Sequence, residues 1–299
     1  NLQPKRSCDE PTRRYTQDIS SDGRIGEHLD IGQRFGEDNR FGARLNLSQR
    51  EGETAVDDQD QRTKLFTAGL DYRGDNFRMS ADIGYQKQRI NHLRNSVRLG
   101  STATKAPTAP DASHNYGQNW SYSESEDTFG MVRGEWDLSD NWTAYLAGGA
   151  RHTREQGTYG TPVLVGNSGA ATMTASDIVH GEDNTSFSTG LNGRLQTGPI
   201  SHQLNLGLAG MWGEQRSAFE NIGAASRYFN NIYHPTPQPR PTPTSFGSDI
   251  HDPRIVGKNQ LKSAALSDTL GVIDDRVLLT LGLRRQSISV DGWNTTSGA

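Results

Sequence analysis

The sequence predicts an all-β protein, an antiparallel transmembrane β-barrel, on three observations. Segments such as Phe41–Ser48 and Phe77–Gln86 alternate apolar residues with small or polar ones. Because strand side chains point alternately to two faces, each segment has one apolar and one polar face. Very short turns alternate with very long connections along the chain. Only 32% of the 299 residues are hydrophobic, which suits a barrel with a polar interior.

About eleven stretches carry this alternation, and each is near or above the 9–11 residues that cross a bilayer at a tilt. The remaining segments are turns and loops without a comparable pattern. We therefore expect strands at Thr12–Ser20, Arg24–Gly36, Arg40–Arg50, Thr63–Arg73, Phe77–Ile90, Thr128–Leu138, Trp142–Glu155, Thr185–Thr197, Ser201–Arg216, Asn259–Ile273 and Val277–Val290.

The connections between these strands fall into two classes. The short ones contain Gly, Asn and Asp, which tolerate positive φ or bond to their own backbone, as tight hairpins require. Short periplasmic turns and long outer loops are typical of outer-membrane barrels, whereas a compact soluble domain rarely holds such long loops. The expected turns are Gly36–Asn39, Gly74–Asn76, Ser139–Asn141, Gly198–Pro199 and Asp274–Asp275; the expected long loops are Glu51–Arg62, Asn91–Asp127, Gln156–Asn184 and Ser217–Lys258, and Ser21–Gly23 is an exceptionally short outer connection.

The alternation assigns one face of each strand to lipid and the other to the interior. Aromatic residues beside the short turns suit an interfacial girdle. The alternative is an antiparallel sandwich with one solvated face, which the long strands and alternating loop lengths disfavour. Rows predicted to face lipid include Phe66 to Tyr72, Phe77 to Tyr85, Leu204 to Leu208 and Val277 to Leu283 in steps of two; Arg44, Asn46, Arg78, Asp82, Gln86, Asn205, Arg284 and Gln286 are predicted to face inward.

Charge, hydropathy and cysteine content limit the kinds of partner and segment that this chain can have. The formal net charge of −4 gives no basic footprint for nucleic acid. The sequence has no run of 18 apolar residues, as a membrane-spanning helix would need. It begins at Asn1 without an initiator Met or an apolar leader, so we expect the export signal to lie upstream of this chain. Cys8 is alone and predicts no internal disulfide.

Several segments carry a family resemblance. They are Asn1-Leu-Gln-Pro-Lys-Arg6, Asp30-Ile-Gly-Gln-Arg-Phe-Gly36 with Arg40-Phe-Gly-Ala-Arg-Leu-Asn46, Asn119-Trp-Ser-Tyr-Ser-Glu-Ser-Glu-Asp127 with Gly134-Glu-Trp-Asp-Leu138, and Leu279-Thr-Leu-Gly-Leu-Arg-Arg-Gln286. In this order and spacing, the chain resembles the TonB-dependent siderophore receptors. Bacterial single-chain barrels have an even number of strands, and plugged outer-membrane transporters have 22. Eleven strands are half of that number.

The resemblance implies a specific organisation and function. Residues 1–11 would be the end of a plug domain, and residues 12–299 the N-terminal half of a 22-stranded plugged barrel. The receptor would lie in the outer membrane of a Gram-negative bacterium, in contact with lipid. It would bind iron as a ferric-siderophore complex and import it to the periplasm without a cofactor or enzymatic step. Energy would come from the TonB complex through an N-terminal segment that this chain lacks.

Ligand capture is expected from aromatic residues of the outer loops, because an apolar, carbonyl-rich chelate favours such surfaces. These rings also suit the interface belt or loop packing. The candidates are Tyr116, Trp120, Tyr122, Tyr159, Tyr228, Phe229 and Tyr233. Residues His234–Pro243 form a polyproline-type segment, predicted to be a stiff surface excursion. The alternative function is a small outer-membrane hydrolase barrel with a lumenal His28–Asp30 pair, since His and Asp can form a general base and its orienting carboxylate. We predict no catalytic residue and no metal site for the receptor itself.

Overall fold

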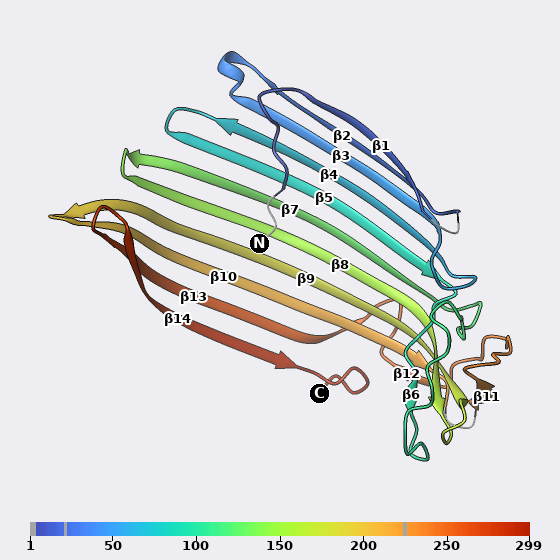
Figure 1. The fold of residues 1–299 in the computed structure, drawn as a ribbon. Coiled ribbons are helices and arrows are strands. Elements are labelled where there is room, and N and C mark those ends of the chain that lie inside the picture. The colour runs from blue at the N-terminus through green and yellow to red at the C-terminus, as the bar shows by residue number, and fades with distance from the viewer. Residues whose placement is uncertain (1–3, 21–22, 224–225) are drawn as a thin grey trace.

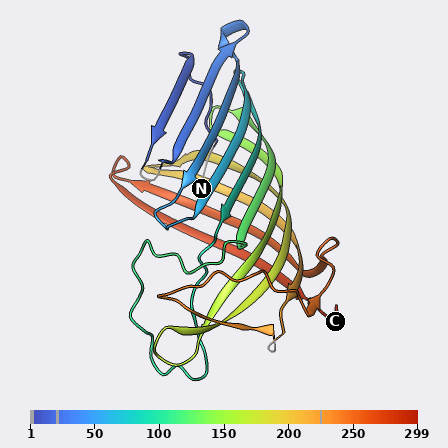
Figure 2. The same ribbon diagram turned by 90° about the vertical axis from the view of Figure 1, so that its right-hand side faces the viewer.

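The computed structural model describes residues 4–20, 23–223 and 226–299. Within them the chain forms one antiparallel meander whose strands lie side by side in sequence order and curve like part of a cylinder wall (Figures 1 and 2). The main path consists of β1 (Thr12–Ile19), β2 (Ile25–Phe35), β3 (Phe41–Glu53), β4 (Asp60–Arg73), β5 (Phe77–Asn91), β7 (Tyr122–Ser139), β8 (Trp142–Leu164), β9 (Ala170–Thr197), β10 (Ile200–Asn221), β13 (Arg254–Val272) and β14 (Val277–Gly292).

Three short strands lie off this path, at the end of the sheet that carries the long loops (Figure 1). They are β6 (Arg98–Leu99), which pairs with β8, β11 (Tyr228–Asn231), which pairs with β9, and β12 (Ser245–Gly247), which pairs with β10. The predicted fold class and the predicted strands of the meander are confirmed in the described residues.

The predicted short turns have the backbone that their residues favour. At Gly36–Asn39 a 3-10 turn, η2 (Glu37–Asn39), joins β2 to β3, and Gly36, Asp38 and Asn39 have φ of 81°, 52° and 53°. Asp274 and Asp275, between β13 and β14, also have positive φ, 54° and 61°. These values lie in the left-handed region that Gly, Asn and Asp tolerate best. Part of the predicted outer connection Ser21–Gly23 lies outside the described residues.

The long predicted loop Gln156–Asn184 is wrong in its extent. Here β8 continues to Leu164 and β9 begins at Ala170, so residues 157–178 form a regular hairpin beyond the predicted strand ends. The reason is that a strand outside a membrane needs no apolar row. Its Ser, Thr and Ala residues maintain the backbone ladder without the alternation that predicted the other strands.

The outer face of the sheet changes from apolar to charged after about ten residues. On β5 the outward row runs from Phe77 through Met79 and Ile83 to Lys87, and the paired row on β7 runs from Trp136 to Glu126. Ten residues of strand at a tilt of about 40° rise by about 25 Å, the height of the apolar band of an outer-membrane barrel. At the short-turn end the rings of Phe35, Phe41, Tyr72 and Phe77 form a continuous row, with centroids 5.1 to 6.4 Å apart. The predicted girdle is therefore present.

None of the helices within the described ranges is long and apolar enough to cross a membrane.

Candidate functional site

The long loops pack together into one structure at the end of the sheet opposite the girdle. Leu164 at the end of β8, Ala171 at the start of β9 and Ile232 of the β10–β13 connection are each 2% exposed or less and form its core. Tyr116 and Tyr233 pack against this core from two different connections. We call residues 92–121, 157–178 and 226–247 the loop cap (Figures 1 and 2). The cap brings together three segments that are far apart in sequence.

The polyproline-type segment is fixed within this cap. The side-chain amide of Gln118, which is 1% exposed, donates to the Thr236 carbonyl at 3.3 Å and accepts the Gln238 N–H at 2.9 Å. The indole N–H of Trp120 donates to the Gln238 carbonyl at 3.0 Å. Asn230 accepts the Thr236 N–H at 2.9 Å and donates to its carbonyl at 3.0 Å. The segment is thus held from both sides.

The β8–β9 hairpin separates the candidate aromatics onto two faces. Directly paired residues of antiparallel strands share a face, and alternate residues take opposite faces. Thr158 and Asp177 are paired, and so are Tyr159 and Ser176. Trp120 lies on the first of these faces, since a Cβ on Gly160 would be 3.1 Å from its Cη2. Tyr159 lies on the second face.

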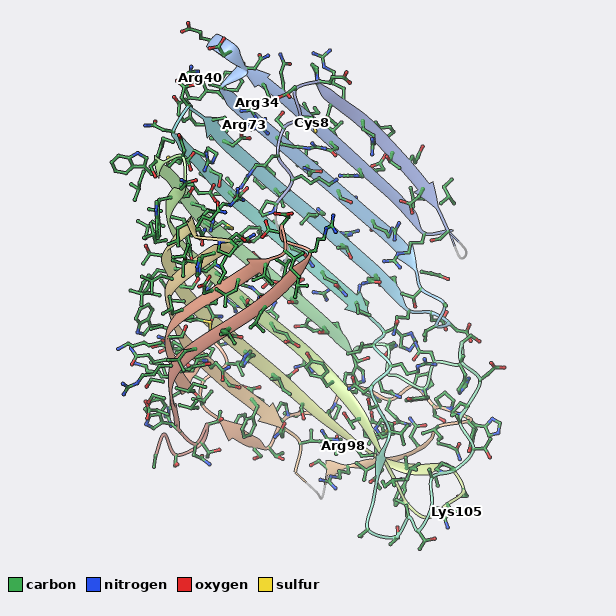
Figure 3. All side chains as sticks on the ribbon, turned by 60° about the vertical axis from the view of Figure 1, so that its left-hand side comes forward. Cys8, Arg34, Arg40, Arg73, Arg98 and Lys105 are labelled. Carbon is green, nitrogen blue, oxygen red and sulfur yellow. The ribbon has the colours of Figure 1, made fainter. Side chains whose placement is uncertain are left out.

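A polar hollow of about 470 Å³ lies on the Tyr159 face. The Tyr159 hydroxyl is 3.3 Å from the Ser123 hydroxyl and donates to Glu155 at 3.2 Å, and burial raises the pKa of Tyr159. The lining contains hydroxyl groups, one guanidinium, one imidazole and the Glu155 carboxylate, so the hollow offers hydrogen-bond donors as well as acceptors to a ligand. The lining residues are Asn95, Ser96, Arg98 (labelled in Figure 3), Glu155, Tyr159, Thr161, Thr174, Ser176, Ile178, His180 and Ser217.

The other candidate aromatics take part in packing or are exposed. The Tyr122 ring lies 4.2 Å below the Arg89 guanidinium, and the Tyr233 hydroxyl donates to the Thr108 carbonyl at 2.5 Å. Burial raises the pKa of Tyr116. The hydroxyl of Tyr228 is buried with no hydrogen-bond partner in the described part of the chain. Phe229 is 76% exposed. The structure therefore brings Tyr116, Trp120, Tyr228 and Tyr233 into the cap but gives only Tyr159 a place in the hollow.

The N-terminal segment, residues 4–9, lies against the inward side chains of β2 to β5. Lys5 pairs with Asp30 at 3.3 Å, and Arg6 makes a bidentate pair with Asp82. Asp30 and Asp82 have side chains only 1% and 3% exposed. Arg44 donates to both oxygens of Asp30 at 2.8 Å and to the Arg6 carbonyl at 2.7 Å. Figure 3 shows Cys8 of this segment near Arg34 and Arg73.

These ion pairs remove the basis of the hydrolase alternative. Asp30 is engaged by Arg44 and Lys5, while His28 Nε2 lies 3.1 Å from Asn46 Oδ1. Both residues face inward as predicted, but they do not hydrogen-bond to each other, so no general-base pair forms. Among the described residues no three His, Cys, Asp or Glu side chains are grouped to hold a metal ion.

Sequence reasoning missed the residues that organise the cap. Gln118 and Asn230 act through side-chain amides, and the Arg240–Asp177 ion pair joins the β10–β13 connection to β9. One sequence feature could have suggested such partners. Proline alternates with other residues from 235 to 243, so the segment makes no hydrogen bonds within itself, and water or side chains of other segments must satisfy its N–H and C=O groups.

Residues 91–299 match a family model described as TonB dependent receptor-like, beta-barrel. The chain is 43% identical over 295 residues to the ferrichrome receptor FcuA of Yersinia enterocolitica, covering 99% of this chain and 38% of that protein. BauA, the ferric preacinetobactin receptor from Acinetobacter baumannii, superposes with a TM-score of 0.86 at 31% identity, over 96% of this chain and 42% of that one. The ferric-catecholate import receptor Fiu from E. coli K12 has the same fold, with a TM-score of 0.76 at 18% identity over 96% and 46% of the two chains. The chain spans about two fifths of the length of these relatives.

Proposed function

The chain belongs to the TonB-dependent receptor-like β-barrel family, and from this premise we propose that its receptor binds a ferric siderophore and imports it to the periplasm. Members of the family are outer-membrane β-barrels of Gram-negative bacteria and are transport receptors rather than enzymes. A TonB complex that acts on a segment outside this chain would drive the import. The observation that carries the proposal is the loop cap with its polar hollow, at the end of the sheet opposite the aromatic girdle.

We propose that residues 1–11 are the end of the plug and residues 12–299 the first half of the barrel. Support comes from residues 4–9, which lie against the inner side chains of β2 to β5 through Lys5 and Arg6. A plug must enter the lumen at such a junction. Residues 1–3 of the proposed plug end lie outside the described residues.

Among the aromatic candidates, we propose that Tyr159 contacts the ligand directly and that Phe229 is a first contact at the surface. Tyr159 lines the hollow beside hydroxyl groups and Arg98, which suits the carbonyl and oxyanion groups of an iron chelate. Phe229 offers an exposed ring on β11 of the cap. Tyr116, Trp120, Tyr122, Tyr228 and Tyr233 would support the site through packing and hydrogen bonds.

Ferrichrome is the first ligand to test because the curated relative is a ferrichrome receptor, and ferric preacinetobactin is the second. In the full-length receptor, Tyr159→Ala should weaken ferric-siderophore binding at least about tenfold, as loss of one buried contact worth about 1.4 kcal/mol would. Phe246→Ala, which removes an exposed ring outside the hollow, is the matched control. If Tyr159→Ala binds the chelate as tightly as the unaltered receptor, the hollow is not part of the binding site. If the unaltered receptor binds neither chelate, both proposed ligands are rejected.

A further inference from the structure

The proline-rich segment 234–243, which we call the strap, has backbone groups that cannot satisfy one another. A polyproline helix contains no internal hydrogen bonds. Prolines at 235, 237, 239, 241 and 243 lack an N–H, so the backbone donors between them are those of Thr236, Gln238, Arg240 and Thr242. Water satisfies these groups where the strap is exposed, as it is at Thr236 and Arg240. Side chains of other segments can take the place of that water where the strap lies against the cap.

Three side chains from other parts of the cap supply them. Gln118 and Trp120 precede β7, and Asn230 lies in β11. Together they occupy the N–H and C=O groups of both Thr236 and Gln238. Gln118 hydrogen-bonds to both strap residues and is the most buried of these three side chains. Its amide replaces a neighbouring strand, because it presents one donor and one acceptor to the strap.

The strap contacts the β8–β9 hairpin directly at β9 and is linked to β8 through Asp177 and Trp120. Arg240 pairs with Asp177 of β9, whose side chain is only 13% exposed. Asp177 also accepts a hydrogen bond from Thr158 of β8 at 2.5 Å. The Trp120 ring, which holds the strap at Gln238, lies against Gly160. These contacts all fall on one face of the hairpin.

The opposite face of the same hairpin forms a wall of the hollow. Tyr159 and Thr161 of β8, with Thr174 and Ser176 of β9, point into it. Strand alternation places each of these residues beside one that faces the strap. The hairpin thus separates the hollow, on one face, from the strap, on the other. A wall held in place before the ligand arrives lowers the ordering cost of binding.

We propose that Gln118 is a positioning residue that fastens the strap behind the β8–β9 hairpin, and that the strap holds this hairpin in the position that forms the ligand-binding hollow. This inference rests on the proposed function for the identity of the ligand and for its binding in the hollow. The fastening itself concerns residues of the cap alone. Neither Gln118 nor the strap needs to contact the ligand.

Hydrogen exchange on the full-length receptor tests the fastening without any ligand. Gln118→Leu keeps the side-chain volume but removes both hydrogen bonds to the strap. Exchange at the Gln238 amide, which loses its acceptor, should become about tenfold faster, as expected for loss of one to two net hydrogen bonds, and residues 157–178 should also exchange faster. The Thr236 amide keeps its acceptor on Asn230 and should change less. Arg240→Ala, a milder change at an exposed residue, should loosen residues 157–178 as well. Lys105→Ala, an exposed basic residue of the cap (Figure 3), is the control and should change neither.

Ferrichrome titration then separates positioning from contact. Gln118→Leu should weaken binding about three- to tenfold, and the double variant with Arg240→Ala should lose less than the sum of the two effects, since both act through the strap. Tyr159→Ala should weaken binding without changing exchange in the strap. Unchanged exchange in residues 157–178 would show that the strap does not hold the hairpin. Unchanged affinity with a loosened hairpin would overturn the positioning role of Gln118. If the unaltered receptor fails to bind ferrichrome, the proposed ligand is rejected, while the exchange experiment still tests whether the strap holds the hairpin.

Discussion

The ion pair between Arg6 and Asp82 should control whether residues 4–9 stay docked on the inner face of the barrel. Arg6 Nη1 donates to Asp82 Oδ1 and Arg6 Nη2 donates to Asp82 Oδ2, and the two side chains are 20% and 3% exposed. Asp82→Asn removes the negative charge and leaves the Arg6 charge without its partner. The other contacts of the segment, from Lys5 and from Arg44 to the Arg6 carbonyl, remain.

The size of the effect follows from the burial of the pair. Breaking a buried ion pair from one side costs about 3–5 kcal/mol. Because Arg6 keeps one fifth of its side-chain surface exposed, water screens part of the unpaired charge, and about 2–3 kcal/mol is a better value. That cost lowers the equilibrium constant for docking by about 30- to 150-fold.

A nitroxide on Cys8, an exposed free cysteine two residues beyond Arg6, reports docking through its electron paramagnetic resonance line shape. Asp82→Asn should add a narrow component from a mobile segment. The double variant Arg6→Met, Asp82→Asn should recover part of the docked population because no charge is left unpaired. Asp75→Asn, at a carboxylate that is 87% exposed and pairs with Arg40, should leave the spectrum unchanged. An unchanged spectrum in Asp82→Asn would show that the pair does not hold the segment.

Two further results are expected. Gly193→Ala should lower the free energy of unfolding by about 1–3 kcal/mol in urea titrations of the refolded barrel, because a Cβ there would overlap the Trp142 ring. Gly148→Ala, whose Cβ would have its nearest neighbour at 3.7 Å, should be nearly neutral. Equal losses of unfolding free energy in the two variants would contradict this reasoning. Burial of the hydroxyl raises the pKa of Tyr228 from 10.0 to about 12, so this tyrosine ionises in the unfolded state at a lower pH than in the folded state. The cap should therefore keep its full stability below pH 10 and lose part of it between pH 10 and 12. Tryptophan fluorescence followed across this range should show a smaller loss in Tyr228→Phe, and identical curves would exclude a contribution from this hydroxyl.

Much of the sheet could be predicted from the sequence because lipid imposes a period. The row from Phe77 to Ile83 and the turn residues at Gly36–Asn39 each specify one local conformation, and the apolar band fixes which side chains face outward. The same reasoning predicted that Asp30 and Asp82 face inward. It could not predict that Lys5 and Arg6 would meet them, because those contacts join residues up to 76 positions apart.

The candidate site was less predictable for a physical reason. The seven aromatic residues were chosen by type, and type does not specify a face: Trp120 and Tyr159 both lie at the β8–β9 hairpin, but on opposite sides of it. Beyond the apolar band no lipid constrains the pattern, so β8 and β9 continue through residues that read as a loop.

By itself the sequence determined the strand meander, its inward and outward faces and the family of the chain, since these depend on local alternation and on short segments. Only the tertiary structure decided that Gln118, Trp120 and Asn230 hold the strap, and that Tyr159 faces the hollow. Those outcomes depend on side chains from separate loops meeting in space, where Gln118, Trp120 and Asn230 satisfy backbone groups that the strap cannot pair within itself.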